Sequence, residues 1–215
     1  MIGSLLYLTA SRPNIQLSVG ICARFQSNPK QSHLNVVKRI LRYLARTTNL
    51  ELWFEKGVSC DVTGYCDADF AGDRMERKST SGCCCFLGKS LITWSSKKQN
   101  TIALSTAEAE YVSAANCCAQ ILWIKHQLED FNLRYTKIPI LCVNTSVINL
   151  AKNPIQHSRS KHIDIKHHFI RDHVQKGDIE LNFVNTEDQI ADIFTKPLAE
   201  DRFCYIKNLL NMINF

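Results

Sequence analysis

The order of the predicted secondary-structure elements indicates an α/β fold with a mixed sheet. Three strand-like stretches come first, and a helix, a strand, a helix, a strand and a helix follow them. Two patterns carry this prediction. Apolar residues recur at helical spacing up to about residue 48 and change to strand spacing from residue 50. Two apolar runs then flank the turn residues Gly88–Ser90, as expected of an antiparallel hairpin.

The N-terminal part of the chain is predicted to be helical over residues 1–48. Its clearest helical pattern places apolar side chains at Val36, Val37, Ile40, Leu41 and Leu44. Pro29 lies just before this helix, at a position where proline is tolerated. From residue 50 the pattern is that of strands. We place them at Leu50–Phe54, Asp61–Phe70, Ser81–Leu87 and Leu91–Ser95.

The second half of the chain alternates helices and strands. A long helix is predicted from about Ser105 to Phe131, with Ser105 or Thr106 as its N-cap and Glu108 in reach of a capping box. Thr186–Gln189 is a second capping signature, which opens a last helix that Pro197 ends. The elements between them are a strand, a helix, a helix after a basic loop and a strand, at Ile138–Val143, Asn144–Lys152, Asp164–Gln175 and Ile179–Val184.

The net charge of +6 comes from the N-terminal quarter of the chain. Residues 1–60 hold eight Lys and Arg against two Asp and Glu, a net of +6, and residues 61–215 hold eighteen of each. A basic segment beside an acidic strand suits a ligand with a phosphate backbone. A solvated helix face is the alternative explanation.

The composition is that of a globular protein with one domain or one and a half. The chain has 215 residues, of which 45% are hydrophobic and 21% charged. Its ten cysteines form no C-x-x-C pair, so we expect reduced, mostly buried thiols in an intracellular protein of the cytoplasm or nucleus. No stretch is long enough to span a membrane, and the N-terminus lacks the basic region of a signal peptide.

Two carboxylates in the run Gly64–Asp73 indicate a metal site. Asp67 and Asp69 lie at strand spacing, so an extended backbone points both side chains to one face. A like-charge pair of this kind is costly unless a cation compensates it. Carboxylate oxygens favour Mg²⁺ or Mn²⁺ over zinc.

Two acids further along the chain are the predicted partners of Asp67. Glu108 and Glu110 lie roughly 200° apart around a helix axis, so only one can face the strand. Glu110 lies on the more apolar stripe and is assigned to the site, whereas Glu108 lies in the first turn and favours the helix dipole. Asp192 has apolar neighbours, and a buried aspartate needs a partner. A metal shared with Asp67 would supply one.

Several motifs occur in a specific order, and together they resemble the ribonuclease H domain of copia-type LTR retrotransposon Pol polyproteins. They are Gly64–Asp73, Trp94–Gln99, Ser105–Tyr111, Ser160–Arg171 and Gln189–Leu198. Residues 1–56 resemble the C-terminal, thumb-like end of the reverse transcriptase of that family, through Gly3–Pro13 and Lys38–Leu44. The resemblance implies a ribonuclease H-like domain at 57–198, with a mixed sheet flanked by helices, an N-terminal helical extension and a C-terminal helix at 199–215.

In that family, four carboxylates bind two Mg²⁺ ions and the RNA strand of an RNA·DNA hybrid is cleaved. The resemblance therefore implies that Asp67, Glu110 and Asp192 are catalytic, metal-binding residues. The third carboxylate position corresponds to Val143, and Asn144 beside it would point to the opposite face. Because two close divalent ions need enough negative ligands, Val143 predicts weakened binding of Mg²⁺ or Mn²⁺ and impaired hydrolysis. The implied partners are the hybrid and the rest of a Pol polyprotein.

Three functions remain open from the sequence. They are a hybrid-cleaving endonuclease, an inactive remnant that at most binds nucleic acid, and a protein-interaction module built on the N-terminal helices. The basic pairs Lys97-Lys98 and Arg159–Lys161 are either contacts to a nucleic-acid backbone or ordinary surface charge. The histidine-rich stretch His157–His173 is interpreted as helix-face residues near phosphate or in solvent, since no cysteine pair supports a zinc site.

Overall fold

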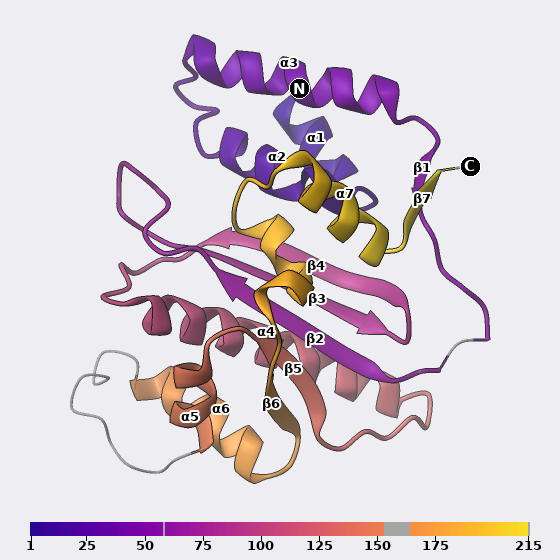
Figure 1. Cartoon of the computed structure of the whole chain (residues 1–215), viewed down its shortest axis with the longest axis vertical. Coiled ribbons are helices and arrows are strands. Elements are labelled where there is room, and N and C mark those ends of the chain that lie inside the picture. Colours follow the sequence, from indigo (N-terminus) through magenta and orange to yellow (C-terminus); the bar gives the residue numbers. More distant parts are fainter. Residues whose placement is uncertain (58, 153–163, 215) are drawn as a thin grey trace.

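A five-stranded mixed sheet forms the centre of the computed structural model, which describes residues 1–57, 59–152 and 164–214 (Figure 1). Its strands are β2 (Val62–Ala68), β3 (Thr80–Leu87), β4 (Ser90–Lys98), β5 (Ile138–Cys142) and β6 (Ile179–Phe183), in the order β4-β3-β2-β5-β6. The strands β2, β3 and β4 pair antiparallel, and β2, β5 and β6 pair parallel. The predicted mixed sheet and its hairpin are confirmed.

Strand β3 shows how the sheet separates two apolar cores. Cys83 and Cys85 belong to the cluster under α4 (Thr106–Glu129), whereas Cys84 and Phe86 belong to a second cluster. Alternation of this kind follows from the two-residue period of a strand, which points successive side chains to opposite faces. All ten cysteines are free thiols, and eight of them are buried. The prediction that the cysteines are mostly buried is therefore confirmed.

Helices α4, α5 (Thr145–Lys152) and α6 (Asp164–Gln175) share one apolar cluster with β2, β5 and β6. The long helix begins as predicted. The Oγ of Ser105 accepts a hydrogen bond from the amide of Glu108 at 3.1 Å, and Oε2 of Glu108 accepts one from the amide of Leu104 at 2.7 Å. Both bonds satisfy amides at the start of the helix, so the capping role of Glu108 is confirmed.

The N-terminal helices pack on one another around a core of their own and contact the sheet. They are α1 (Ile2–Leu8), the short 3₁₀ helix η1 (Pro13–Ile15), α2 (Gln16–Ala23) and α3 (Gln31–Arg46). In α3, Val37 and Ile40 are buried in this core. The indole Nε1 of Trp94 on β4 donates to the backbone carbonyl of Thr9 at 3.0 Å, which ties the helices to the edge of the sheet. Among the helices of the described residues, none combines the length and apolar character needed to cross a membrane.

The first and last strands of the chain form a separate two-stranded sheet. β1 (Leu50–Leu52) pairs antiparallel with β7 (Met212–Asn214), which follows α7 (Glu200–Leu209). The prediction of a helix over 199–215 is therefore right for α7 and wrong for the last residues. Asn211 follows the helix with a left-handed backbone, φ 60°, and Met212 then pairs with Leu52 and enters the core cluster that also contains Leu50. The predicted strand at Leu50–Phe54 is shorter than expected and lies outside the central sheet.

The last predicted helix is wrong in type. Residues 186–194 form two short 3₁₀ helices, η3 (Thr186–Asp188) and η4 (Ile190–Phe194), with Gln189 extended between them. The Nε2 of Gln189 donates to the carbonyl of Cys66 on β2 at 2.9 Å, and its Oε1 accepts from the amide of Ala191 at 3.1 Å. Because these bonds bind a fully buried side chain to the sheet, they outweigh continuation of a helix through Gln189.

We predict that Gly82→Ala destabilises the fold by about 1–3 kcal/mol, the range for overpacking a core. Gly82 pairs with Asp67, and a methyl group on it would lie 2.7 Å from Cγ2 of Thr195 and 2.8 Å from Cβ of Phe194. Urea unfolding measures the loss. The matched control is Gly20→Ala in α2, where no atom lies within 4 Å and alanine is expected to stabilise by up to about 1 kcal/mol. Equal effects of the two substitutions would contradict the close approach at Gly82.

Candidate active site

The three acids predicted from the sequence come together at the carboxyl end of β2. Asp67 is the penultimate residue of that strand, Glu110 lies in the second turn of α4, and Asp192 is the central residue of η4. Their exposed fractions are 2%, 6% and 3%, respectively. Three elements that are distant in sequence thus deliver three buried carboxylates to one place.

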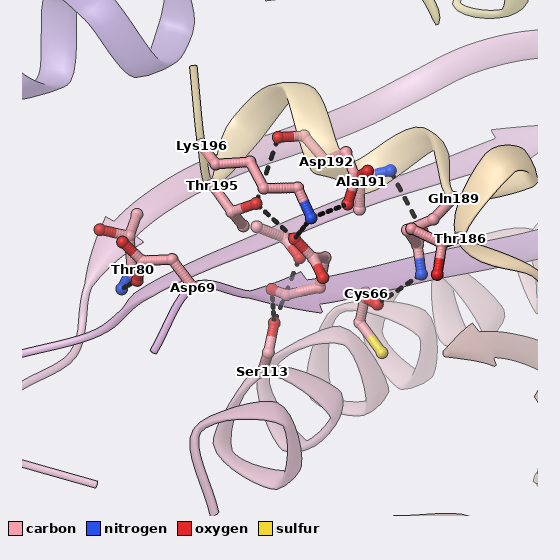
Figure 2. A network of polar contacts seen from close by, with 12 residues as sticks. Cys66, Asp69, Thr80, Ser113, Thr186, Gln189, Ala191, Asp192, Thr195 and Lys196 are labelled. Atoms are coloured by element: carbon pink, nitrogen blue, oxygen red, sulfur yellow. Dashed lines mark hydrogen bonds and ion pairs between the residues drawn. The ribbon is translucent and has the colours of Figure 1, made fainter. Parts of the chain in front are cut away.

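Asp67 is held by hydrogen bonds on both its side chain and its backbone. The hydroxyl of Thr195 lies within hydrogen-bonding distance of Oδ2 of Asp67 and 3.1 Å from the carbonyl of Asp192. On the other side, Oγ of Ser113 in α4 donates to the backbone carbonyl of Asp67 at 2.7 Å (Figure 2). These contacts join the end of β2 to α4 and to the end of η4.

Glu110 is the acid with the most perturbed protonation. Burial, together with the negative charge of Asp67, raises the pKa of Glu110 to about 9. Its Oε2 is buried and has no hydrogen-bond partner within the described residues. At neutral pH this carboxyl group therefore holds a proton unless a cation compensates it.

Asp192 lies between two basic side chains that the sequence did not indicate. Nζ of Lys196 is 2.7 Å from Oδ1 of Asp192 and 3.8 Å from Oδ2 of Asp67, and Nη2 of Arg202 is 3.7 Å from Oδ2 of Asp192. Figure 2 shows the Lys196 side chain folded back toward the carboxylates. Burial raises the pKa of Asp192, and Lys196 partly offsets that shift. The four-residue spacing of Asp192 and Lys196 was the signal that sequence reasoning missed.

Asp69 lies apart from this cluster. The strand ends at Ala68, and the side chain of Asp69 accepts a hydrogen bond from the amide of Thr80 (Figure 2). Asp69 follows the last residue of the strand, and this hydrogen bond directs its side chain to Thr80 of β3. Asp69 orders the loop between β2 and β3 instead.

Val143 is the residue that follows β5. The parallel register of β2 and β5 pairs Tyr65 with Leu141, and Asp67 and Val143 each stand two residues beyond that pair. Asn144, next in sequence, caps α5, since its Oδ1 accepts hydrogen bonds from the amides of Ser146 at 2.9 Å and Val147 at 3.4 Å. Neither residue therefore offers a free oxygen ligand at this point.

The donor set matches a hard divalent cation in chemistry but does not form a closed ligand shell. Oxygen donors from Asp67, Glu110 and Asp192 are of the kind that Mg²⁺ and Mn²⁺ prefer, and the unpartnered Oε2 of Glu110 needs a cation or a proton. Across the described ranges, no group of three or more His, Cys, Asp and Glu side chains has the spacing of a metal site. The ammonium group of Lys196 supplies positive charge to the cluster.

The histidines expected near phosphate do not join the cluster as far as they are described. Nδ1 of His173 pairs with Oδ2 of Asp178 at 2.8 Å, and its ring packs edge-on against Phe169. His157, His162 and the basic loop Arg159–Lys161 lie outside the described residues. His167 and His168 lie in α6, and their side chains fall outside the described part of the structure.

A groove of about 760 Å³ runs beside the site over β3, β4 and the middle of α4. Its lining includes Gly82, which pairs with Asp67 in the sheet, and Ser113, which donates a hydrogen bond to the carbonyl of Asp67. Gln16 of the N-terminal helices also lines the groove. Lys97 lines it with an exposed side chain, whereas Lys98 is paired with Asp73 at 2.9 Å and with Glu76 at 2.6 Å. Of the predicted basic pair, Lys97 is thus the residue that is exposed.

We predict that Glu110→Gln stabilises the metal-free protein more at pH 8 than at pH 5. The folded pKa of Glu110 is raised to about 9, so the native state keeps a proton that the unfolded chain releases above its ordinary pKa of 4.5. The neutral acid contributes its full stability below pH 4.5, and this contribution is lost as the pH rises toward 9. Glutamine cannot ionise, so the variant does not lose stability in this way. Thermal unfolding at both pH values measures it. Glu108→Gln, on the same helix, is the control, and an equal pH-dependent gain there would contradict the assignment.

We predict that Lys196→Met lowers the melting temperature of the metal-free protein and enlarges the stabilisation that Mn²⁺ provides. Removal of the ammonium leaves Asp67 and Asp192 without their nearest positive charge, and a divalent ion can then replace it. Thermal unfolding with and without Mn²⁺ tests this. Lys176→Met changes the same charge on an exposed lysine and is the control. An unchanged Mn²⁺ response in Lys196→Met would show that the ammonium does not compensate the cluster.

The chain is similar in sequence to known Pol polyproteins. No family model matches the chain. It is 43% identical over 204 residues to the Retrovirus-related Pol polyprotein from transposon RE1 of Arabidopsis thaliana, and 38% identical over 212 residues to that from transposon TNT 1-94 of Nicotiana tabacum. The matches cover 94% and 98% of this chain, but the chain spans only 14% and 16% of the length of these relatives.

A solved structure supports the same conclusion for the fold. LC11-RNase H1, isolated from compost, superposes with a TM-score of 0.50 at 13% identity, over 63% of this chain and 93% of that structure. A likeness at this identity shows the fold alone. Sequence and fold together lead to one conclusion: the chain belongs to the Pol polyproteins of copia-type retrotransposons, as a segment with a ribonuclease H-like fold.

Proposed function

We propose that residues 57–198 are a ribonuclease H domain that acts on the RNA strand of RNA·DNA hybrids by metal-dependent hydrolysis, with impaired activity. One observation carries the proposal: Asp67, Glu110 and Asp192 are buried together at the carboxyl end of β2 in a ribonuclease H-like fold. In this proposal, residues 1–56 derive from the end of a reverse transcriptase, and residues 199–215 form a C-terminal helix and strand. The polypeptide would act as part of a longer Pol polyprotein.

Asp67, Glu110 and Asp192 would hold Mg²⁺ or Mn²⁺ in this domain. A bound divalent ion activates water and stabilises charge on the attacking and leaving oxygens. The chain's own residues prepare the site for it. Thr195 orients the carboxylate of Asp67, and Glu110, whose pKa is raised to about 9, would hold the ion in its deprotonated form. Asp192, which is ion-paired with Lys196, would be the third residue to hold it.

Impairment follows from Val143. Two divalent ions close to each other need several anionic ligands, and Val143, the residue after β5, offers an isopropyl group instead of a carboxylate. Asn144 cannot compensate while its Oδ1 caps α5. We therefore expect one ion to be held poorly and hydrolysis to be slow relative to an enzyme with four carboxylates.

The second candidate is an inactive remnant that binds nucleic acid without cleaving it. Val143 favours it, and so does the groove beside the site, which presents polar side chains from β4 and α4. In this groove, Lys97 can contact a backbone phosphate, and Trp123, 58% exposed, offers a ring for stacking. A surface that contacts phosphates and bases without recognising a particular sequence suits an RNA·DNA hybrid.

A third candidate, a protein-interaction module, has support only from the N-terminal helices. Tyr7 is 86% exposed and Leu6 40% exposed on α1, and Leu41 is 43% exposed on α3. Exposed apolar side chains of this kind mark contact surfaces when they are contiguous. Under the first proposal the same residues would contact the remainder of the reverse transcriptase.

We predict that Val143→Asp raises cleavage of a labelled RNA·DNA hybrid by roughly 10–100-fold, the range reported for residues that support metal ligands. Asp67→Asn is expected to abolish cleavage, because it removes the anionic ligand at the centre of the cluster. The assay compares both variants with the wild type in Mg²⁺ and in Mn²⁺, and an all-DNA duplex serves as the control substrate.

The outcomes separate the three candidates. Cleavage by the wild type that Asp67→Asn removes supports the impaired nuclease and rejects the remnant. Cleavage that occurs only in Val143→Asp supports the remnant. Failure of every variant to bind the hybrid at low salt, where electrostatic binding is strongest, supports the protein-interaction module.

A further inference from the structure

Arg202 on α7 makes a set of contacts that is concentrated on the turn carrying Asp192. Its guanidinium donates to the backbone carbonyls of Thr186 at 2.7 Å and of Gln189 at 3.3 Å, and also to the carbonyl of Glu187. The same group lies 3.7 Å from Oδ2 of Asp192. One side chain thus contacts the backbone of η3, the backbone of Gln189 after it, and the acid of η4.

The turn needs such support because its own backbone bonds are few. η3 has three residues and η4 has five, and Gln189 between them is extended. 3₁₀ segments have poorer hydrogen-bond geometry than an α-helix and are usually short. Side chains therefore hold the turn in place: Gln189 fastens it to β2, and Arg202 fastens its outer carbonyls.

Arg202 is itself placed by the two ends of the chain. On α7, Ile206 and Leu210 are fully buried in the cluster that also contains Ile193 and Phe194 of η4. Phe203, next to Arg202, packs edge-on against Tyr43 of α3 with ring centroids 6.2 Å apart. The paired strands β1 and β7 contribute Leu50 and Met212 to the same apolar cluster. Residues before 57 and after 198 therefore jointly anchor the helix that bears Arg202.

We propose that Arg202 is a positioning residue for Asp192, and that through it the terminal segments of the chain order the carboxylate cluster for a divalent ion. The proposal rests on the proposed metal-dependent function. Arginine suits this role because its planar fork donates several hydrogen bonds in fixed directions, whereas lysine carries the same charge at one point. Replacement of Arg202 by lysine keeps the positive charge but removes the planar fork, so it separates the effect of positioning from that of charge.

The experiment compares the full-length wild type with Arg202→Lys and Arg202→Gln. Two quantities are measured: Mn²⁺ affinity by electron paramagnetic resonance, and hydrogen exchange of the Ala191 amide, which donates to Gln189. We expect Arg202→Lys to weaken Mn²⁺ binding by roughly tenfold, the lower end of effects for residues that orient metal ligands. Exchange at Ala191 should accelerate in parallel. Arg134→Lys, the same change at an exposed arginine, is the control.

Each outcome supports or overturns the proposal that Arg202 positions Asp192. Weaker Mn²⁺ binding and faster Ala191 exchange in Arg202→Lys, with Arg134→Lys unchanged, support positioning. A lower melting temperature of Arg202→Lys with both quantities unchanged overturns it, since Arg202 would then only stabilise the fold. Loss of Mn²⁺ affinity in Arg202→Gln alone would assign the effect to charge and also overturn it. A wild type that binds no Mn²⁺ contradicts the proposed function and the metal part of this inference, while the exchange data still report whether Arg202 orders the turn.

Discussion

Compensation of negative charge at the carboxyl end of β2 is the constraint on which the rest of the structure depends. Asp67, Glu110 and Asp192 are almost fully buried, and unpaired buried carboxylates are costly. Two features reduce that cost in the chain itself. Glu110 holds a proton, because its pKa is raised to about 9, and Lys196 brings an ammonium group to Asp192 and Asp67.

The geometry of the C-terminal part follows from the need to bring Asp192 close to β2. Gly82 leaves room on β3 for the backbone of η4, and the carbonyl of Ala191 lies 3.0 Å from where a side chain would begin. Gln189 and Thr195 fasten the two ends of the turn to β2. A regular α-helix would not present its ends in this way, which explains why the segment is split into 3₁₀ turns.

Under the proposed function, Val143 would shift the balance between stability and metal affinity at this site. A carboxylate at this position would add a negative charge beside the cluster and would supply an oxygen ligand. Valine does neither. Three positive charges already surround the three carboxylates: the proton on Glu110, the ammonium of Lys196 and the guanidinium of Arg202. The cluster is therefore close to electrically balanced without a metal, and less free energy would be available to attract divalent ions.

Local patterns in the sequence determined most of the elements and the identity of the acids. Helical and strand periodicity located the hairpin at Gly88–Ser90 and the long helix after Ser105, and the apolar stripe distinguished Glu110 from Glu108. Ordered motifs carried the assignment of Asp67 and Asp192 to one site, because the family relation supplies long-range information that periodicity lacks. The apolar residue at position 143 was also readable from the sequence alone.

Only the tertiary structure decided which charges compensate the acids and how the last segment folds. Arg202 approaches Asp192 because η4 and α7 pack on the same cluster, and no local pattern encodes that packing. Lys196 has a local signal in its four-residue spacing from Asp192, but its approach to Asp67 depends on the fold. Gln189 interrupts the expected helix because its partner, the carbonyl of Cys66, lies 123 residues earlier in the chain. The pairing of β1 with β7 joins the two ends of the chain in the same way. Propensity acts over a few neighbouring residues, whereas these contacts depend on the whole fold, and buried polar groups take whichever partner that fold provides.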